Sequence, residues 1–305
     1  MLDKKCNIQV ESDTKLYENI PVNFIYNRFD LQGNDPSKTI LLCISNTEDI
    51  YIPVKISGSV AWLGIELTRI SAKIIRHIVK FLFSNYPEIK EVRYKNGMTA
   101  VGDWVKHNYF VLKFPKSVEE LNNRMSADHR RKMKNRMRVI ERDYGKIDFF
   151  CYKREDVPPH IMDRYFELKN LSHDRKYDLS PTEYFDTFFV THIYVLTIND
   201  KVEAIRLECE QGEHVYDENH TYNMALNKHS PGLVIYYKYL EKMIDSDKKM
   251  LFLSGGNYSY KQRFGSQELQ VYDCVIYKSR IKRGVAFSKR QLRRIKRLLI
   301  NKIES

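Results

Sequence analysis

Residues 214–233 read HVYDENHTYNMALNKHSPGL, and this stretch decides the fold because a predicted strand runs directly into a predicted helix. The strand is expected over residues 214–226. Ser230 suits the N-cap and Pro231 the first helical position, which predicts a helix from there to about residue 246. A helix that opens from a strand presents unpaired backbone N–H groups and the positive end of its dipole. Such a turn is suited to binding a pyrophosphate.

The residues of the turn agree with an anion site, although a well-capped helix start explains them equally well. Gly232 has no side chain at the point where an anion would approach the backbone. His229 and Lys228 can add positive charge beside it. The turn alone therefore leaves both interpretations open.

Outward from this segment, the sequence predicts an α/β lobe. Before it lie a strand over residues 146–152, helices near 158–171 and 181–190, and a hairpin of strands 192–198 and 201–210. The dipeptide Asn199-Asp200 forms the turn of that hairpin. After the helix come a strand over 250–254, the break Gly255-Gly256, a brief helix and a strand over 268–277.

The amino-terminal part shows a second strand-and-helix pattern. Strands are expected over residues 39–45, 49–56 and 60–66, followed by a helix over 71–86 that Pro87 ends. A further helical segment, residues 117–143, contains a basic run after the N-cap candidate Ser126 and ends at Gly145. The predicted division is therefore an amino-terminal lobe over 1–116, a basic connecting helix over 117–145, a complete lobe over 146–285 and a basic amphipathic tail helix over 286–305.

Composition places the chain among globular proteins of a reducing compartment. Of its 305 residues 43% are hydrophobic and 30% charged, and the formal charge of +12 predicts attraction to anions. The five cysteines are scattered without a CxxC pair, and neither a disulfide framework nor a metal site is expected. The first residues lack a signal-peptide pattern, and no stretch of about 18 apolar residues occurs. We expect a cytoplasmic protein, with contact at the inner face of a membrane as an option for the tail.

Four segments resemble a known family in their order along the chain. They are residues 126–145 with clustered Arg and Lys, 194–210 around Asn-Asp-Lys-Val-Glu-Ala, 222–232 ending in Ser-Pro-Gly, and 252–261, which read FLSGGNYSYK. Together they resemble the CelD-like branch of the GNAT superfamily of acyltransferases, which is related to the FemAB-type transferases. The resemblance covers about residues 117–280, and residues 1–115 match only as a degenerate first lobe.

The resemblance implies an α/β fold of two GNAT-like lobes, each a mixed sheet flanked by helices, with the second lobe complete. It implies acetyl-CoA or another acyl-CoA as cosubstrate, bound where two neighbouring strands splay apart, one of them over residues 214–226. The residues expected to bind it are Met224, Leu226, His229, Ser230, Gly232 and Leu233. Two features depart from the family: its usual Asp before the Gly is absent, since this chain reads Leu253-Ser254-Gly255, and the turn lacks the Q/RxxGxG/A consensus.

The chemistry of acyl transfer suggests candidate catalytic groups. The attacking amine must lose a proton and the leaving thiolate must gain one. Glu208 lies on the strand before the cofactor strand, on the same face as Glu210, and is the predicted base. Tyr260 is the predicted acid, and Lys261 beside it can bind a substrate phosphate or carboxylate. A solvated strand face and tyrosine packing are the simpler alternatives.

Acceptor contacts are expected from Arg130, Arg131, His173 and Tyr258. The resemblance implies an amine acceptor, such as an amino sugar or a nucleotide- or lipid-linked precursor in surface polysaccharide synthesis. One alternative is an aminoacyl-tRNA-dependent, FemAB-like transferase whose basic helix faces RNA. Another is a non-catalytic module that binds an anionic membrane through the tail.

Overall fold

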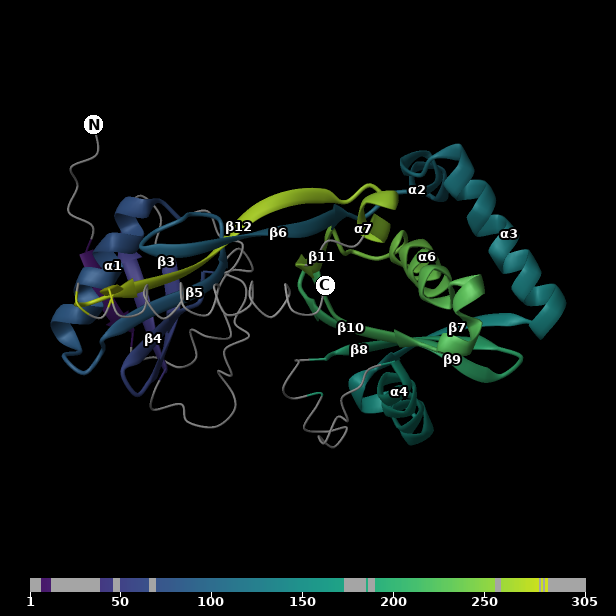
Figure 1. Cartoon of the computed structure of the whole chain (residues 1–305), viewed down its shortest axis with the longest axis horizontal. Helices are drawn as coiled ribbons and strands as arrows, with labels where there is room; N and C mark the ends of the chain where they lie inside the picture. Colours follow the sequence, from purple (N-terminus) through teal and green to yellow (C-terminus); the bar gives the residue numbers. More distant parts are fainter. Residues whose placement is uncertain are drawn as a thin grey trace, which may run out of the picture. The chain divides into compact units, whose positions relative to one another are not determined.

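The computed structural model describes residues 7–11, 39–45, 50–65, 70–172, 185, 190–255, 259–279, 281, 283 and 284 (Figure 1). The chain forms two compact units, one of Met1–His107 with Gln270–Ser305 and one of Asn108–Leu269. The chain passes from the first unit to the second within β6 (Asp103–Lys113) and returns within β12 (Gln267–Tyr277). The predicted tail over 286–305 lies outside the described residues and stays a prediction.

The described part of the first unit contains a mixed sheet and the helix α1 (Ala72–Asn85). Its strands are β1 (Asn7–Glu11), β2 (Thr39–Ser45), β3 (Ile50–Ser57), β4 (Val60–Leu63) and β5 (Glu91–Gly97), followed by β12, in that order across the sheet. Only β4 and β5 are parallel, and α1 connects them. Ser71 caps α1 by accepting a hydrogen bond from the Ile74 N–H at 3.3 Å, and Ile75, Ile78 and Leu82 are buried in the core of this unit.

The second unit has the strand order β6-β11-β10-β9-β8-β7. The strands are β7 (Ile147–Lys153), β8 (His192–Ile198), β9 (Lys201–Gln211), β10 (His214–Tyr222) and β11 (Met250–Gly255). Only β10 and β11 are parallel, and α6 (Pro231–Met243) connects them. Figure 1 shows α6 and α4 (Pro159–Ser172) on opposite faces of this sheet, with α3 (Ala127–Tyr144) on the same face as α6. The expected α/β class, with mixed sheets flanked by helices, is confirmed.

Two apolar layers hold the second unit together because strand side chains alternate between its faces. On the α6 face the core includes Leu196, Ala204 and Val215 with Val234 and Leu240. On the α4 face a separate cluster is formed by Ile161, Met162, Tyr165, Ile193, Val195, Ile205 and Leu207. The even-numbered residues of β9 therefore face α6 and the odd-numbered ones face α4.

Local signals predicted the turns of the second unit well. The β8–β9 hairpin turns at Asn199 and Asp200, whose φ angles of 48° and 62° are the positive values that such a turn requires. Pro231 stands at the start of α6, as expected. Ser126 caps α3 by accepting from the His129 N–H at 3.2 Å, and Gly145 follows the helix with a φ of 110°.

Two predicted boundaries were wrong. The strand expected over residues 214–226 ends at Tyr222, and Met224–His229 form a 3₁₀ helix, η5. Asn223 starts that helix, since its side chain accepts a hydrogen bond from the Ala225 N–H at 3.0 Å. The segment expected to be helical over 117–143 is divided into α2 (Val118–Arg124) and α3, because Met125 and Ser126 are extended.

Candidate functional site

The parallel strands β10 and β11 part after only three residue pairs. They are in register from His214 opposite Met250 to Tyr216 opposite Phe252. Beyond that point β10 has a bulge between Asp217 and Asn219 and stays paired with β9 as far as Tyr222. The second half of β10 therefore no longer has β11 as its neighbour, and a strand that loses its neighbour in this way can accommodate an extended ligand. At His220, however, the N–H and C=O already bond Asn219 and Lys169.

A buried charge cluster lies where the two strands part. Glu208 of β9 is opposite Asp217 of β10, and both side chains face Arg206. The Arg206 Nε donates to Glu208 Oε1, and its Nη2 lies 3.5 Å from Asp217 Oδ1. The exposed fractions of Arg206, Glu208 and Asp217 are only 2%, 0% and 6%. The guanidinium also lies over the rings of Tyr236 and Tyr239, at 4.8 and 4.6 Å from their centres.

This cluster leaves several polar atoms without a hydrogen bond among the described residues. They are Arg206 Nη2, Glu208 Oε2, Asp217 Oδ1 and the hydroxyls of Tyr236 and Tyr239. A buried polar atom without a hydrogen bond is costly, and such atoms gather where a ligand or water completes the arrangement. The cluster is therefore the strongest candidate site in the second unit.

The predicted base Glu208 lies within this cluster, fully buried. Burial raises the pKa of its carboxyl well above the usual range, the charge of Asp217 adds to this shift, and Arg206 opposes it. A carboxyl of this kind accepts a proton readily, but its contact with Arg206 fixes one of its two oxygens.

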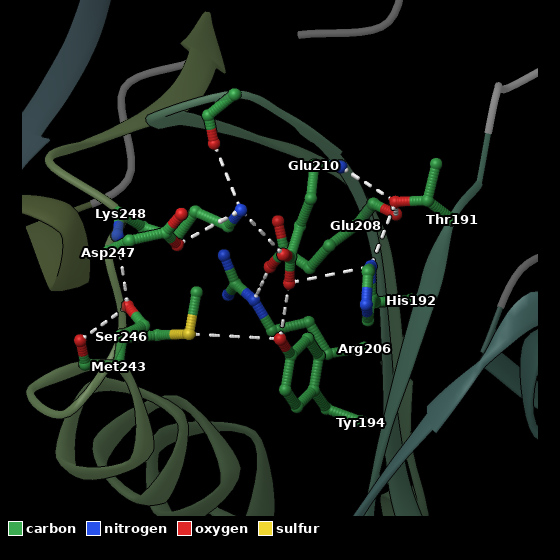
Figure 2. A network of polar contacts seen from close by, with 11 residues as sticks. Thr191, His192, Tyr194, Arg206, Glu208, Glu210, Met243, Ser246, Asp247 and Lys248 are labelled. Atoms are coloured by element: carbon green, nitrogen blue, oxygen red, sulfur yellow. Dashed lines mark hydrogen bonds and ion pairs between the residues drawn. The ribbon is translucent and has the colours of Figure 1, made fainter.

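Glu210 lies on the same face of β9 as Glu208, as predicted, but its carboxylate contacts side chains other than Arg206, as Figure 2 shows. Its Oε1 accepts a hydrogen bond from the Tyr194 hydroxyl at 2.6 Å and lies 3.5 Å from His192 Nδ1. Its Oε2 lies 3.5 Å from the Nζ of Lys248, which also donates to the Gly212 carbonyl at 2.9 Å. These contacts tie the Glu210 carboxylate to a position near the end of β9.

His220 is a site residue that sequence reasoning missed. It lies on β10 beyond the residues in register with β11, and its ring is 6.1 Å from that of the predicted acid Tyr260. The Tyr260 ring in turn packs edge-on against Tyr236, at 5.8 Å. Burial lowers the pKa of His220, which keeps its imidazole neutral at neutral pH. One signal was present in the sequence, the polar run 217–220 inside a predicted strand, but no metal or catalytic spacing singled out this histidine.

Two buried lysines lie beside the same strands. Lys261, at the predicted site, donates from Nζ to the Leu253 carbonyl at 2.6 Å, and Lys169 of α4 donates to Asn219 Oδ1 and to the His220 carbonyl. Burial lowers the pKa of Lys169 to about 8 and lowers that of Lys261, while the charge of Asp217 opposes both shifts. Both ammonium groups thus hold backbone or side-chain oxygens of the parting strands, and Lys169 was missed because α4 is 50 residues away in sequence.

The predicted cofactor turn has a tightly packed glycine. A Cβ on Gly232 would lie 2.9 Å from Cδ1 of Tyr222, so the absence of a side chain allows the two elements to meet. Ser230 precedes it in the left-handed conformation, with a φ of 52°, and its side chain does not cap α6. His229 Nε2 lies 3.2 Å from the hydroxyl of Tyr144 at the end of α3.

The other predicted cofactor residues differ in exposure. Met224 is 44% exposed on η5, whereas Leu226 and Leu233 are partly buried against the core of the second unit. Of these three apolar side chains, Met224 is therefore the most accessible to a ligand.

The predicted acceptor residues are not gathered at one place by the described structure. Arg130 donates from Nη1 to the carbonyls of Asn122 and Met125, both at 2.8 Å, and so closes the end of α2. Arg131 is exposed and pairs with Asp128 at 3.0 Å. His173 and Tyr258 lie outside the described residues. In the part of the chain that the structure covers, no group of three or more acidic, His or Cys side chains is placed to bind a metal.

Comparison with known proteins agrees with this geometry. Residues 127–262 match the family model of the acetyltransferase (GNAT) domain. No curated protein matches the chain. Residues 127–262 are thus a GNAT acetyltransferase domain, and the protein is an acyltransferase.

Solved structures show the same fold at low sequence identity. FemX is 8% identical with a TM-score of 0.59, covering 88% of this chain and 97% of its own. A conserved protein of unknown function from Bacteroides thetaiotaomicron is 11% identical, with a TM-score of 0.52 and coverage of 89% and 100%. L-PGS from Bacillus licheniformis is 10% identical, with a TM-score of 0.50 and coverage of 75% and 81%. The two-lobed GNAT-like fold expected from the sequence is confirmed.

Proposed function

Because residues 127–262 are a GNAT acetyltransferase domain, we propose that the protein transfers an acyl group from acyl-coenzyme A to an amine at the point where β10 and β11 part. One observation carries this proposal. The register between β10 and β11 ends directly beside the buried cluster of Arg206, Glu208 and Asp217. A strand edge for an extended cosubstrate and a set of buried proton-exchanging groups therefore occur together.

The cosubstrate fits this edge by its chemistry. The pantetheine arm has amide groups that can pair with exposed strand backbone, as an added strand does. The first turn of α6, after Ser230, offers backbone N–H groups and a positive dipole end to the pyrophosphate. We place the thioester near Asp217, since the strands part there.

In the reaction, the amine nitrogen attacks the thioester carbonyl, the carbon–sulfur bond breaks, and the amine proton passes to a base. Two groups are candidates for the base, Glu208 and His220. We favour His220, because burial keeps it neutral and no hydrogen bond to an arginine holds it. Glu208, held by Arg206, is the alternative and would act through a water molecule. The hydroxyl of Tyr260, whose ring centre lies 6.1 Å from that of His220, is the proposed donor to the departing thiolate.

The acceptor remains a proposal that comes from the resemblance to the CelD-like branch. It is a small amine, such as an amino sugar or a nucleotide- or lipid-linked sugar of surface polysaccharide synthesis. A cytoplasmic location agrees with such a role. Among the described residues no helix is long and apolar enough to cross the bilayer.

Release of free thiol from acetyl-CoA tests the proposed function directly. Wild-type protein should release coenzyme A faster when an acceptor amine is added, and acylated amine should appear in equal amount. The panel of amines should include amino sugars, free and as nucleotide conjugates. No acylated product from any amine, with acetyl-CoA or longer acyl-CoA, would contradict the proposal.

An aminoacyl-tRNA-dependent transferase is the second candidate, and the surface of α3 favours it. The exposed cations of this helix are Arg131, Lys132, Lys134, Arg138 and Arg142. Such a surface would bind tRNA with strong salt dependence. Replacing Arg131 and Lys134 by Gln should then lower the slope of log affinity against log salt by about one for each lost phosphate contact. A slope equal to that of the wild type would exclude this face as the RNA site.

A further inference from the structure

The inward side of α3 contains two buried donors that have no hydrogen-bond acceptor among the described residues. His129 Nε2 and Arg136 Nη1 are both shielded from solvent without a partner there. His129 is only 7% exposed. The two residues lie on one stripe of the helix, together with the core residues Met133 and Ile140.

A third nitrogen-bearing side chain, that of Arg263 at the end of α7 (Ser259–Arg263), acts on the same place. Its neighbour Phe264 packs edge-on against the His129 ring, with ring centres 5.3 Å apart. Two effects lower the pKa of His129 and that of Arg136. The larger is burial, and the second is the positive charge of Arg263. Three nitrogen-bearing side chains from two elements therefore converge on one small region.

The charge of Arg136 has no compensating carboxylate among the described residues. Among the described residues, only Asp128 contributes a negative charge to His129, and none contributes to Arg136. The Asp128 side chain is 52% exposed and already pairs with Arg131 and Lys132. A water molecule would satisfy the unpaired donors, but it would leave the charge of Arg136 uncompensated among the described residues. An anion satisfies both.

From these observations we propose that His129, Arg136 and Arg263 form a binding site for a phosphate group between α3 and α7. Planar guanidinium groups bind phosphate oxygens through two parallel hydrogen bonds, and the imidazole adds a third donor. The site is separate from the turn at Ser230, and its existence does not depend on the proposed reaction. The phosphate belongs either to coenzyme A or to a second, phosphorylated ligand such as the acceptor.

Thermal unfolding with pyrophosphate as the probe tests this site. A tenfold excess over the dissociation constant should raise the wild-type midpoint by about 3 °C. Arg136→Met should lose most of this shift, any remainder coming from the turn at Ser230, while its midpoint without pyrophosphate stays equal or rises because a buried donor without an acceptor is removed. Arg138→Met, an exposed change of the same charge on the same helix, should keep the shift. Arg263→Met serves as a second variant from the other side of the site.

Affinity for coenzyme A identifies the source of the phosphate. If Arg136→Met weakens binding of coenzyme A at least tenfold but not that of pantetheine, the site holds a cofactor phosphate. If pyrophosphate binding is lost and coenzyme A binds as in the wild type, the site holds the phosphate of a second ligand. Both results support the site. It would be overturned by a wild-type protein that does not respond to pyrophosphate, or by Arg136→Met and Arg263→Met responding as the wild type does.

Discussion

Asp217 lies directly opposite Glu208 across β9 and β10, and the two carboxylates share the guanidinium of Arg206. This pair marks the position where β10 leaves β11, since Tyr216, one residue earlier, is the last residue in register with that strand. Burying two carboxyl groups and one guanidinium costs free energy of folding unless their charges compensate one another. The proposed reaction depends on this arrangement.

Replacing Arg206 tests how strongly the cluster is coupled. Arg206→Met should lower the free energy of unfolding by about 3–5 kcal/mol, because it leaves two buried acids without their cation. Arg142→Met, which removes an exposed arginine paired with Asp143, should change it by less than about 0.5 kcal/mol. Denaturant unfolding measures both. A loss below about 1 kcal/mol for Arg206→Met would show that the cluster is solvated.

The role of His220 predicts a pH dependence of turnover. Burial lowers the pKa of His220, so the neutral base should be fully present at pH 7, and kcat should fall only below about pH 6.5. His220→Asn should reduce kcat about 100-fold and remove this acidic limb. The pH dependence of kcat, measured for the wild type and for His220→Asn, tests this role. A limb that persists unchanged in the variant would transfer the role of base to Glu208.

The lowered pKa of His220 also predicts that the free energy of unfolding decreases at acidic pH. The unfolded chain binds the proton more readily than the folded one, so this histidine makes the fold less stable as pH falls through about 6.5. His220→Asn should show a smaller loss of stability between pH 7 and pH 5 than the wild type. An equal loss in both proteins would mean that His220 is hydrated.

The hydroxyl of Tyr260 is expected to act only in the chemical step. Tyr260→Phe should lower kcat about 10-fold to 100-fold by slowing thiolate protonation, while the affinity for acetyl-CoA stays nearly constant. Tyr152→Phe, on β7, serves as the control and should leave kcat unchanged. Turnover of the Tyr260 variant equal to that of the wild type would remove this residue from the mechanism.

Gly232 allows packing against Tyr222 to be separated from anion binding. Gly232→Ala should cost about 1–3 kcal/mol, because its Cβ would crowd the Tyr222 ring. Adding Tyr222→Leu should restore part of that stability, and denaturant unfolding of the double mutant checks this coupling. If the double mutant still binds acetyl-CoA like Tyr222→Leu alone, the glycine serves packing and not the pyrophosphate.

Sequence patterns predicted the parts of this fold that depend on local signals. The Asn199-Asp200 turn and the start of α6 at Pro231 need only the backbone preferences of those residues, and both are where the sequence placed them. The end of β10 was misplaced because Asn223 is tied to Glu203, 20 residues earlier, through its amide and its backbone N–H. Periodicity contains no information on such a contact.

The candidate site was only partly predictable for the same reason. Glu208 and Glu210 were correctly placed on one face, since a spacing of two residues fixes that in any strand. The difference between them was not predictable: Glu208 faces Arg206 within a fully buried cluster, whereas Glu210 meets Tyr194 and Lys248. Lys169, from α4, contacts Asn219 of β10 only because tertiary packing brings α4 against that strand.

Titration calorimetry with acetyl-CoA tests the central claim, that the parting strands hold an acyl-coenzyme A, most directly. The proposal predicts one site per chain with a dissociation constant in the range of about 1 µM to 1 mM, as for typical enzyme substrates. Tyr260→Phe should bind with the same affinity. Absence of binding by the folded protein, to acetyl-CoA and to longer acyl-CoA alike, would contradict the claim.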